Sequence, residues 1–349
     1  MTHWKEILHN SITTPDELAQ LFDFNCSALK PVCASFPMRI NNYYLNLIQS
    51  VNDPLWQQAV PSPIELEPSV CVADPLAEEN LSPVPNLVHK YPDRVLFLIH
   101  SECAMYCRFC TRKRKVGTEK MVISNESIEA GIGYIREHPQ VREVLLSGGD
   151  PLLLSDERLD TILTRLRSIP TLEVIRIGTR IPCTLPMRVT RQLAAMLKKH
   201  HPLYINTHFN HPRELTPEAA LACARLADAG IPLGCQTVLL KGINDNPDTL
   251  KKLFTGLLRM RVKPYYLFQG DLTQGTNHFR TSTSSGIAIM RQLIGTISGM
   301  AVPTYALDAP DGKGKIPLTP DYILSRGEQL SFRNYCGKLC TYPENGDPL

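Results

Sequence analysis

The stretch RVLFLIHSECAMYCRFC, residues 94–110, places three cysteines on one predicted loop directly after an apolar run. The run at 95–99 is short, apolar and partly β-branched, which predicts a buried strand. Cys103, Cys107 and Cys110 follow with the spacing C-x3-C-x2-C. Three thiolates on one loop can bind three irons of a four-iron cluster and leave the fourth iron open to a substrate or cofactor. A structural zinc is the alternative, but it would need a fourth ligand and usually paired C-x2-C spacing.

Strands and helices alternate from residue 94 onward. Five further short apolar segments are predicted strands: 143–146, 174–177, 203–206, 233–239 and 264–267. Helices are predicted between them, and Thr216-Pro217 and Asn246-Pro247 are typical helix starts. Six βα units predict an α/β fold with a parallel sheet curled into a partial (β/α)6 barrel. Such barrels bind ligands at the C-terminal ends of their strands, so the cysteine loop is expected at the functional end.

The segments on either side of this region have a different character. The first part of residues 1–94 is helical, with Thr14-Pro15-Asp16-Glu17 as a capping box, and the stretch 54–92 is rich in proline. We interpret that stretch as an extended arm lying on the main domain. The chain is therefore predicted to have three parts, an N-terminal arm (1–94), a partial barrel (95–300) and a C-terminal extension (301–349).

The composition limits the possible partners and the compartment. The 349 residues are 43% hydrophobic and carry a net charge of +3, which gives no reason to expect a nucleic acid or a membrane partner. No apolar run approaches the ~20 residues of a membrane span, and the N-terminus lacks the apolar region of a secretory signal. Eleven cysteines, an odd number with three in one loop, argue against a disulfide framework. We therefore expect a cytoplasmic protein.

A second motif, Ser147-Gly148-Gly149-Asp150-Pro151, follows the second predicted strand of the barrel. Glycines let a backbone approach a ligand closely, and an acid can accept hydrogen bonds from its polar groups. Alone, such a motif is more often a tight turn. Gly178-Thr179-Arg180, His208 and Gln236 follow later strands and are expected at the same end of the barrel, although a lone His or Gln there more often completes a hydrogen-bond network.

A third motif, DAPDGKGKIP at 308–317, contains two lysines on a glycine-rich loop. A lysine in such a loop can reach an aldehyde cofactor and bond to it. Without other information, an exposed turn with two solvated lysines is the simpler interpretation.

Taken together, these motifs resemble those of the lysine 2,3-aminomutase family of radical S-adenosylmethionine (SAM) enzymes. The resemblance covers nearly the whole chain and includes the blocks SPVP at 82–85, HKYPDRV at 89–95, CAMYCRFCTRKR at 103–114, THFNHP at 207–212 and HFRT at 278–281. It implies a radical SAM fold with a [4Fe-4S] cluster on the three cysteines. It also implies SAM binding by Ser147, Gly148, Gly149, Asp150, His208 and Gln236.

The resemblance further implies pyridoxal 5′-phosphate (PLP) as a cofactor. Lys315 matches the catalytic lysine that holds PLP; Lys313 is a rival, but its spacing from Asp308-Ala309-Pro310 fits less well. Lys90, Tyr91 and Arg94 match the segment that holds PLP, although relatives usually have arginine in place of Lys90. The C-terminal extension would then carry the PLP lysine, on a loop whose glycines are interrupted by Asp311 and Lys313.

The substrate class follows from three further matches. Arg112 matches the arginine that pairs with the substrate carboxylate, and Asp271 and Asp308 match two acids that bind the distal ammonium of lysine. Relatives acting on glutamate are expected to have a lysine and an amide at the last two positions. The resemblance therefore implies an isomerase that moves the 2-amino group of L-lysine to C3 by radical chemistry and gives β-lysine.

Three alternatives stay open at this stage. The two acids could also bind the guanidinium of arginine, or the enzyme could supply β-lysine for modifying elongation factor P, although those relatives lack the Asp308-Ala309-Pro310 block. A cluster-bearing electron-transfer protein without turnover is the third.

The resemblance also bears on partners and metals. It implies a small-molecule amino acid substrate, an electron donor such as flavodoxin or ferredoxin, and a homo-oligomer, for which we predict a dimer. No structural zinc is predicted, because Asn246 stands where zinc-binding relatives have a cysteine and Cys336 and Cys340 do not match their cysteine cluster.

Overall fold

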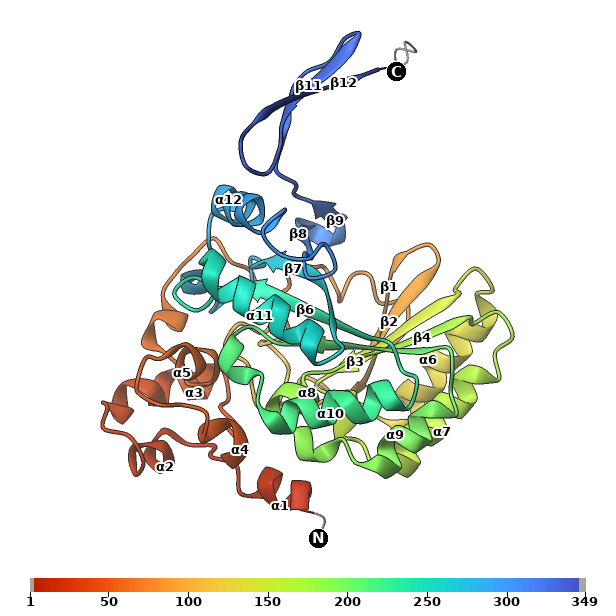
Figure 1. Cartoon of the computed structure of the whole chain (residues 1–349). Helices are drawn as coiled ribbons and strands as arrows, with labels where there is room; N and C mark the ends of the chain where they lie inside the picture. The colour runs from red at the N-terminus through yellow and green to blue at the C-terminus, as the bar shows by residue number, and fades with distance from the viewer. Residues whose placement is uncertain (1–2, 345–349) are drawn as a thin grey trace.

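The computed structural model describes residues 3–344 and contains a nine-stranded sheet in the order β1 to β9 (Figure 1). Strands β2 to β8 are parallel, and their bounds are Arg94–His100, Glu143–Gly148, Val174–Gly178, Leu203–His208, Leu233–Leu239, Lys263–Gln269 and Thr304–Ala309. The first six coincide with the six predicted strands, which confirms the α/β partial barrel.

The sheet also extends beyond the predicted barrel region on both sides. β1 (Leu87–Tyr91) belongs to the predicted N-terminal arm and pairs antiparallel with β2. β8 continues the parallel order, and β9 (Gly314–Pro317) pairs antiparallel with β8. Parts of the segments before residue 95 and after residue 300, β1 and β9, therefore form the two edges of one sheet.

The parallel strands bury one face more deeply than the other. In β3 and β6, buried residues alternate with half-buried ones. The buried residues face the covering helices and form a continuous apolar core: Phe97, Val144, Leu146, Ile175, Ile177, Leu203 and Ile205 are all fully buried. The half-buried positions face the barrel interior and include polar side chains such as Ser147 and Gln236.

The helical elements between the strands are α6 (Asn125–Glu137), η3 (Pro151–Leu153), α7 (Asp156–Arg167), α8 (Ile181–Thr184), η4 (Pro186–Arg188), α9 (Arg191–Lys198), η5 (Pro212–Glu214), α10 (Pro217–Asp228), α11 (Pro247–Arg259), η6 (Asn277–Phe279) and α12 (Thr283–Leu293). Of these, α6, α7, α9, α10 and α11 lie along the outside of the sheet (Figure 1). The side chains of Thr216 and Asn246 cap α10 and α11, as their sequences predict. Within residues 3–344, no helix combines the length and the apolar character that crossing a membrane requires.

The N-terminal arm packs against the cysteine loop. Its helical segments are α1 (His3–His9), α2 (Pro15–Ala19), η1 (Cys26–Leu29), α3 (Lys30–Ser35), α4 (Asn42–Leu45), α5 (Pro54–Ala59) and η2 (Pro63–Leu66). The predicted capping box at Thr14 is present. Backbone N–H groups of Tyr106 and Arg108 donate to the carbonyl oxygens of Arg39 and Gln58 at 3.0 and 2.9 Å. The arm therefore helps to fix the conformation of the loop.

The C-terminal end forms a separate three-stranded sheet that projects from the body (Figure 1). Its strands are β10 (Ile323–Ser325), β11 (Gln329–Arg333) and β12 (Leu339–Pro343), and η7 (Pro310–Gly312) precedes β9. Cys336 lies in the turn between β11 and β12 and Cys340 lies in β12, so both belong to a hairpin, as expected. The Tyr335 ring in this turn packs against Gly295, where a Cβ atom would come within 2.4 Å of the ring.

Candidate active site

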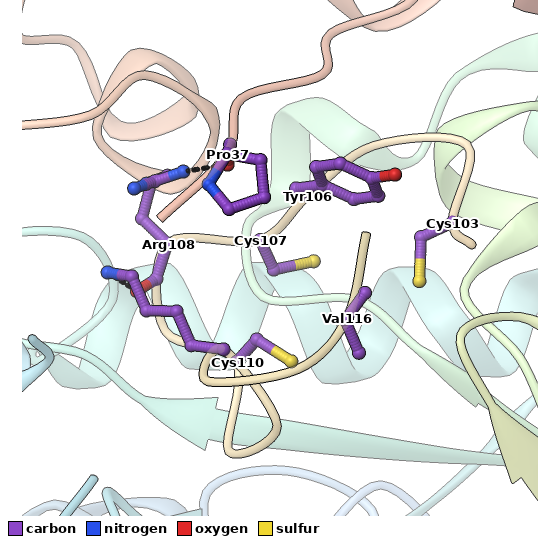
Figure 2. Close-up of a pocket in the computed structure, with 8 residues that line it drawn as sticks. Pro37, Cys103, Tyr106, Cys107, Arg108, Cys110 and Val116 are labelled. Carbon is purple, nitrogen blue, oxygen red and sulfur yellow. Dashed lines mark hydrogen bonds between the residues drawn. The ribbon is translucent and has the colours of Figure 1, made fainter. Parts of the chain in front are cut away.

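The three cysteines of the loop after β2 line one cavity. Figure 2 shows the thiols of Cys103, Cys107 and Cys110 directed into the same space, which is also lined by Pro37, Tyr106, Arg108, Lys113 and Val116. In the part of the chain that the structure describes, no three His, Cys, Asp or Glu side chains are close enough to hold a single metal ion. A four-iron cluster accepts more widely spaced thiolates because each one binds a different iron. The donor set and its spacing therefore fit such a cluster.

Burial affects the protonation of these thiols. It raises the pKa of Cys103 well above its ordinary value, with a further contribution from Asp150, and it raises the pKa of Cys110 to about 11, with a contribution from Cys107. Iron binding must therefore displace protons, because the thiolate is the ligand form. The remaining thiol of the loop contacts a guanidinium, since Arg180 Nη1 lies 2.8 Å from Cys107 Sγ.

Arg180 belongs to a buried polar network behind the cluster loop. Its Nη2 donates to Glu214 Oε1 at 2.8 Å and to Gln58 Oε1 at 2.7 Å, and its guanidinium lies 5.1 Å from the Phe109 ring centroid. The position of Arg180 directly after β4 indicates a place at this end of the barrel, but its contact with a cysteine sulfur could not be inferred from the sequence. The network holds the guanidinium in place next to Cys107.

A second buried ion cluster attaches the cysteine loop to the N-terminal arm. Arg108 Nη2 and Lys113 Nζ lie 2.6 and 2.7 Å from Glu65 Oε2, and Lys113 Nζ also donates to the Gly275 carbonyl at 3.0 Å. All three charged side chains are at most 4% exposed. Burial, together with Arg108, lowers the pKa of Lys113 to about 8. Glu65 is therefore the only acid that neutralises two buried cations in this group.

Removing this acid is expected to destabilise the fold. In a Glu65→Ala variant, Arg108 and Lys113 stay buried without their counter-ion, which should cost about 3–5 kcal/mol of unfolding free energy. Urea unfolding of the iron-free protein measures this loss. Glu67→Gln, at an exposed position two residues away, is the matched control and should change the free energy by less than about 0.5 kcal/mol. Equal stability of the Glu65→Ala variant and the parent would contradict this account.

Three predicted SAM contacts lie on the half-buried face of their strands, two at the C-terminal end and Gln236 in the middle of β6. They are Ser147 in β3, His208 in β5 and Gln236 in β6. Burial, assisted by Arg180, lowers the pKa of His208 to about 3, so its imidazole is neutral. One ring nitrogen of His208 is paired with Asn210 Oδ1 at 3.0 Å, which leaves the other ring nitrogen for a ligand.

Gly148, Gly149 and Asp150 are used mainly within the protein. A Cβ on Gly148 or Gly149 would lie 2.1 Å from a backbone carbonyl oxygen at residue 100 or 102, so the glycines allow β3 to approach the start of the cysteine loop. The Asp150 carboxylate is buried and accepts hydrogen bonds from Thr179 Oγ1 and from the backbone N–H of Arg180, both at 2.7 Å. The backbone N–H of Leu152 donates to it as well, and because a carboxylate can accept about four hydrogen bonds, Asp150 stays a predicted SAM contact.

A second group of predicted residues meets where the two edges of the sheet approach each other. Lys315 in β9 places its Nζ 3.1 Å from Asp308, and Lys90 in β1 places its Nζ 3.3 Å from the same carboxylate. The backbone N–H of Lys315 donates to Tyr91 Oη at 3.1 Å. The guanidinium of Arg94 lies over the Tyr91 ring at 3.9 Å. These residues are brought together although 224 positions separate Tyr91 from Lys315.

This group has the donors that a phosphorylated aldehyde cofactor requires. Lys315 has a primary amine, Lys90 and Arg94 are cationic, and the Tyr91 ring offers an apolar face. The rival lysine, Lys313, is 72% exposed and pairs with Asp311. The structure therefore distinguishes the two lysines of this loop, since only Lys315 contacts the other predicted residues.

The two predicted acids interact electrostatically. Burial and the nearby charge of Asp308 raise the pKa of Asp271 to about 7, while Lys315 and Lys90 act in the opposite direction. The predicted arginine, Arg112, is held in a bidentate pair with Glu78, at 2.9 Å from Nε and 2.6 Å from Nη2. Its Nη1 faces Ser147 Oγ at 3.5 Å. Glu78 was not identified in the sequence, where it stands in an acidic pair without a distinctive motif.

The sequence matches known families in two regions. Residues 98–253, from β2 through the start of α11, match the radical SAM superfamily, and residues 290–348 match the family described as lysine-2,3-aminomutase. Together with the cysteine cavity at the end of β2, the first match defines a radical SAM enzyme, a class that uses a [4Fe-4S] cluster and SAM.

Similarity to curated proteins extends over nearly the whole chain. The L-lysine 2,3-aminomutase of Acetoanaerobium sticklandii is 48% identical over 348 residues, which cover 98% of this chain and 84% of that protein. The protein of the same name from Bacillus subtilis is 44% identical, over 98% of this chain and 78% of that protein. The glutamate 2,3-aminomutase of Clostridioides difficile is also 44% identical, over 97% and 81%. The chain belongs to the lysine 2,3-aminomutase family.

Proposed function

We propose that this protein is an L-lysine 2,3-aminomutase that acts on free lysine with PLP, in addition to the cluster and SAM, and forms β-lysine. The observation that carries the proposal is the pair of acids, Asp271 and Asp308, beside Lys315. The names of the relatives favour the same activity but include a glutamate enzyme, so the residues around the substrate's distal group decide between them.

When bound, the cluster and SAM supply radical chemistry and PLP supplies a conjugated π-system that stabilises an unpaired electron. The protein's residues bind and orient. Cys103, Cys107 and Cys110 would hold the cluster, and Lys315 would hold PLP. Ser147, Gly148, Gly149, Asp150, His208 and Gln236 would contact SAM, while Lys90, Tyr91 and Arg94 would contact PLP.

The charges around Asp308 suit a cationic ligand. Asp271 and Asp308 together face two ammonium groups, those of Lys90 and Lys315. If Nζ of Lys315 held PLP, it would no longer be an ammonium partner of Asp308, and that carboxylate could pair with the distal ammonium of lysine. A buried ammonium costs several kcal/mol unless it is paired, and the two acids provide that pairing.

The same charges disfavour a substrate with an anionic end. The γ-carboxylate of glutamate would lie beside two carboxylates, and like charges at close range repel. Arginine has a cationic end that the acids could pair with, so it stays the second candidate for the substrate. Supply of β-lysine to elongation factor P is a further alternative that concerns the use of the product.

The experiment is a substrate comparison under anaerobic conditions. The protein is reconstituted with iron, sulfide and PLP, reduced with dithionite in the presence of SAM, and given L-lysine, L-arginine or L-glutamate separately. The proposal expects β-lysine from lysine and little or no product from glutamate. Intact cluster and PLP absorption without β-lysine formation would refute the proposal. Faster conversion of arginine than of lysine would show that arginine is the preferred substrate.

The raised pKa of Asp271 makes lysine binding depend on pH. Only the ionised carboxylate pairs with an ammonium, and with a pKa of about 7 its ionised fraction falls about tenfold between pH 8 and pH 6. The KM for lysine is therefore expected to rise by up to about tenfold over that range. An Asp271→Asn variant should show a higher KM without this pH dependence. A flat profile in the parent protein would contradict the role assigned to Asp271.

Other properties stay predictions. The eleven free cysteines favour a reducing compartment, and we propose a cytoplasmic location on that basis. An electron donor such as flavodoxin or ferredoxin, a dimeric assembly and the lack of a structural zinc are expected from the family resemblance.

A further inference from the structure

Residues 74–81 of the N-terminal arm, here called the bridging segment, contact three separate parts of the candidate site. The Pro75 carbonyl accepts a hydrogen bond of 3.1 Å from the backbone N–H of Asp311, near the Lys315 strand. The Leu81 carbonyl accepts one of 2.9 Å from His89 in β1. Glu78, between them, pairs with Arg112 after the cysteine loop. The segment therefore connects both edges of the sheet with the loop that holds the cysteines.

The pair between Glu78 and Arg112 is buried and geometrically specific. Glu78 uses both carboxylate oxygens, at 2.6 and 2.9 Å, and its side chain is 5% exposed while that of Arg112 is 14% exposed. Burial opposes the charge of Glu78, but Arg112 more than offsets it and lowers the pKa of the acid. The pair is therefore fully ionised, and its bidentate form fixes the plane of the guanidinium.

The pair with Glu78 uses the Nε and Nη2 side of the guanidinium and leaves Nη1 directed toward the barrel interior. Nε and Nη2 are bound to Glu78, whereas Nη1 has only a long contact of 3.5 Å with Ser147 Oγ. Ser147 stands at the end of β3 on the half-buried face, beside the other proposed ligand contacts. A carboxylate that binds Arg112 can therefore reach Nη1 from the barrel interior without breaking the pair.

Glu78 is also electrostatically coupled to the acids at the other end of the site, because its charge contributes to raising the pKa of Asp271. Glu78 therefore pairs directly with Arg112 and also acts through its charge on Asp271. A substrate with a carboxylate at one end and an ammonium at the other would extend between Arg112 and the acid pair.

We propose that Glu78 is a positioning residue that fixes the Arg112 guanidinium so that its Nη1 edge receives the α-carboxylate of the substrate. This inference rests on the proposed function, since it assigns Arg112 to a substrate carboxylate. If Glu78 positions Arg112 in this way, ligands that carry a carboxylate need Glu78 for tight binding, and ligands without a carboxylate do not.

The test compares the binding of two ligands to the reconstituted holoprotein. L-lysine has the α-carboxylate, and pentane-1,5-diamine has both amino groups without it. In a Glu78→Gln variant, which keeps the shape but removes the charge, we expect the Kd of lysine to rise about tenfold or more, because Arg112 loses its fixed orientation. The Kd of the diamine should change less than about twofold. Calorimetry under anaerobic conditions measures both values without turnover.

Two further variants complete the comparison. Glu79→Gln is the matched control, because Glu79 is the next residue, is 60% exposed and pairs with Arg114 and Lys115; it should leave both Kd values unchanged. Glu78→Asp keeps the charge and should show a smaller loss, again for lysine alone. If the Glu78→Gln variant is insoluble, the same comparison of lysine with the diamine is made with the Glu78→Asp variant.

Three results would overturn the proposal. Equal weakening of lysine and the diamine would show that Glu78 only supports the fold, and unchanged lysine binding would show that Arg112 needs no positioning. Tighter lysine binding would show that Glu78 competes with the substrate. If the parent protein binds lysine but forms no β-lysine, the proposed function fails, whereas a selective loss in the variant still supports the inference about Glu78.

Discussion

Replacing any one of Cys103, Cys107 and Cys110 by serine is expected to abolish β-lysine formation, with a loss on the order of 10⁴-fold or more. All three thiols line the same cavity, and a cluster with a missing ligand cannot present an open iron in the same place. The alcohol of serine is a poor substitute, because its oxygen does not ionise at neutral pH as a thiol does on binding iron. Product formation, iron content and the low-temperature electron paramagnetic resonance signal measure the effect.

A cysteine outside the cavity gives the matched control for this experiment. Cys336 lies exposed in the turn of the C-terminal hairpin, and Cys336→Ser should retain the iron content and activity of the parent. Undiminished β-lysine formation by a variant of Cys103, Cys107 or Cys110 would refute the assignment of the cluster to this loop.

The second large effect is expected at Lys315. In Lys315→Ala the amine that would bond to PLP is missing, and β-lysine formation should fall on the order of 10³-fold or more. The variant should also lose the visible absorption of protein-bound PLP after gel filtration, because only non-covalent contacts from Lys90, Tyr91 and Arg94 would hold the cofactor. The iron content should not change, since Lys315 lies on β9 and the cysteines lie after β2.

The neighbouring lysine separates this effect from a general change of the loop. Lys313 is 72% exposed and pairs only with Asp311 among the described acids, so Lys313→Ala should keep PLP and activity within about twofold. Loss of PLP in Lys313→Ala, with retention of PLP in Lys315→Ala, would show that Lys313 holds the cofactor and that Lys315 does not.

The six central strands and the cysteine loop could be predicted from the sequence because their determinants are local. Short β-branched runs such as 233–239 specify buried strands, and Thr216-Pro217 specifies a helix start, without reference to distant residues. The grouping of Lys90, Tyr91, Asp308 and Lys315 was expected only from the resemblance to a family. The contacts that join them connect β1 to β8 and β9 and have no local pattern.

Other features depended on tertiary contacts and were not predicted. β8 and β9 flank Pro310 and Gly312, so propensity alone favours a loop there, and the pairing of β8 with β7 and of β9 with β8 overrides it. The contacts of Asp150 with Thr179 and Arg180 were not predicted, because a carboxylate beside two glycines gives no indication of whether it faces a ligand or its own backbone. Glu65 and Glu78 were missed because their partners, Arg108 and Arg112, are more than 30 residues away.

The nine-stranded sheet stays open between its edge strands, because β1 and β9 share no backbone ladder in the described chain. At that seam, Tyr91 and Lys90 reach Lys315 and Asp308 through single side-chain contacts, each worth about 1 kcal/mol. The bridging segment adds a backbone hydrogen bond on the β9 side, from the Asp311 N–H to the Pro75 carbonyl. The proposed reactive end is therefore bordered by a junction of isolated contacts, where local opening should cost less free energy than separating the parallel strands.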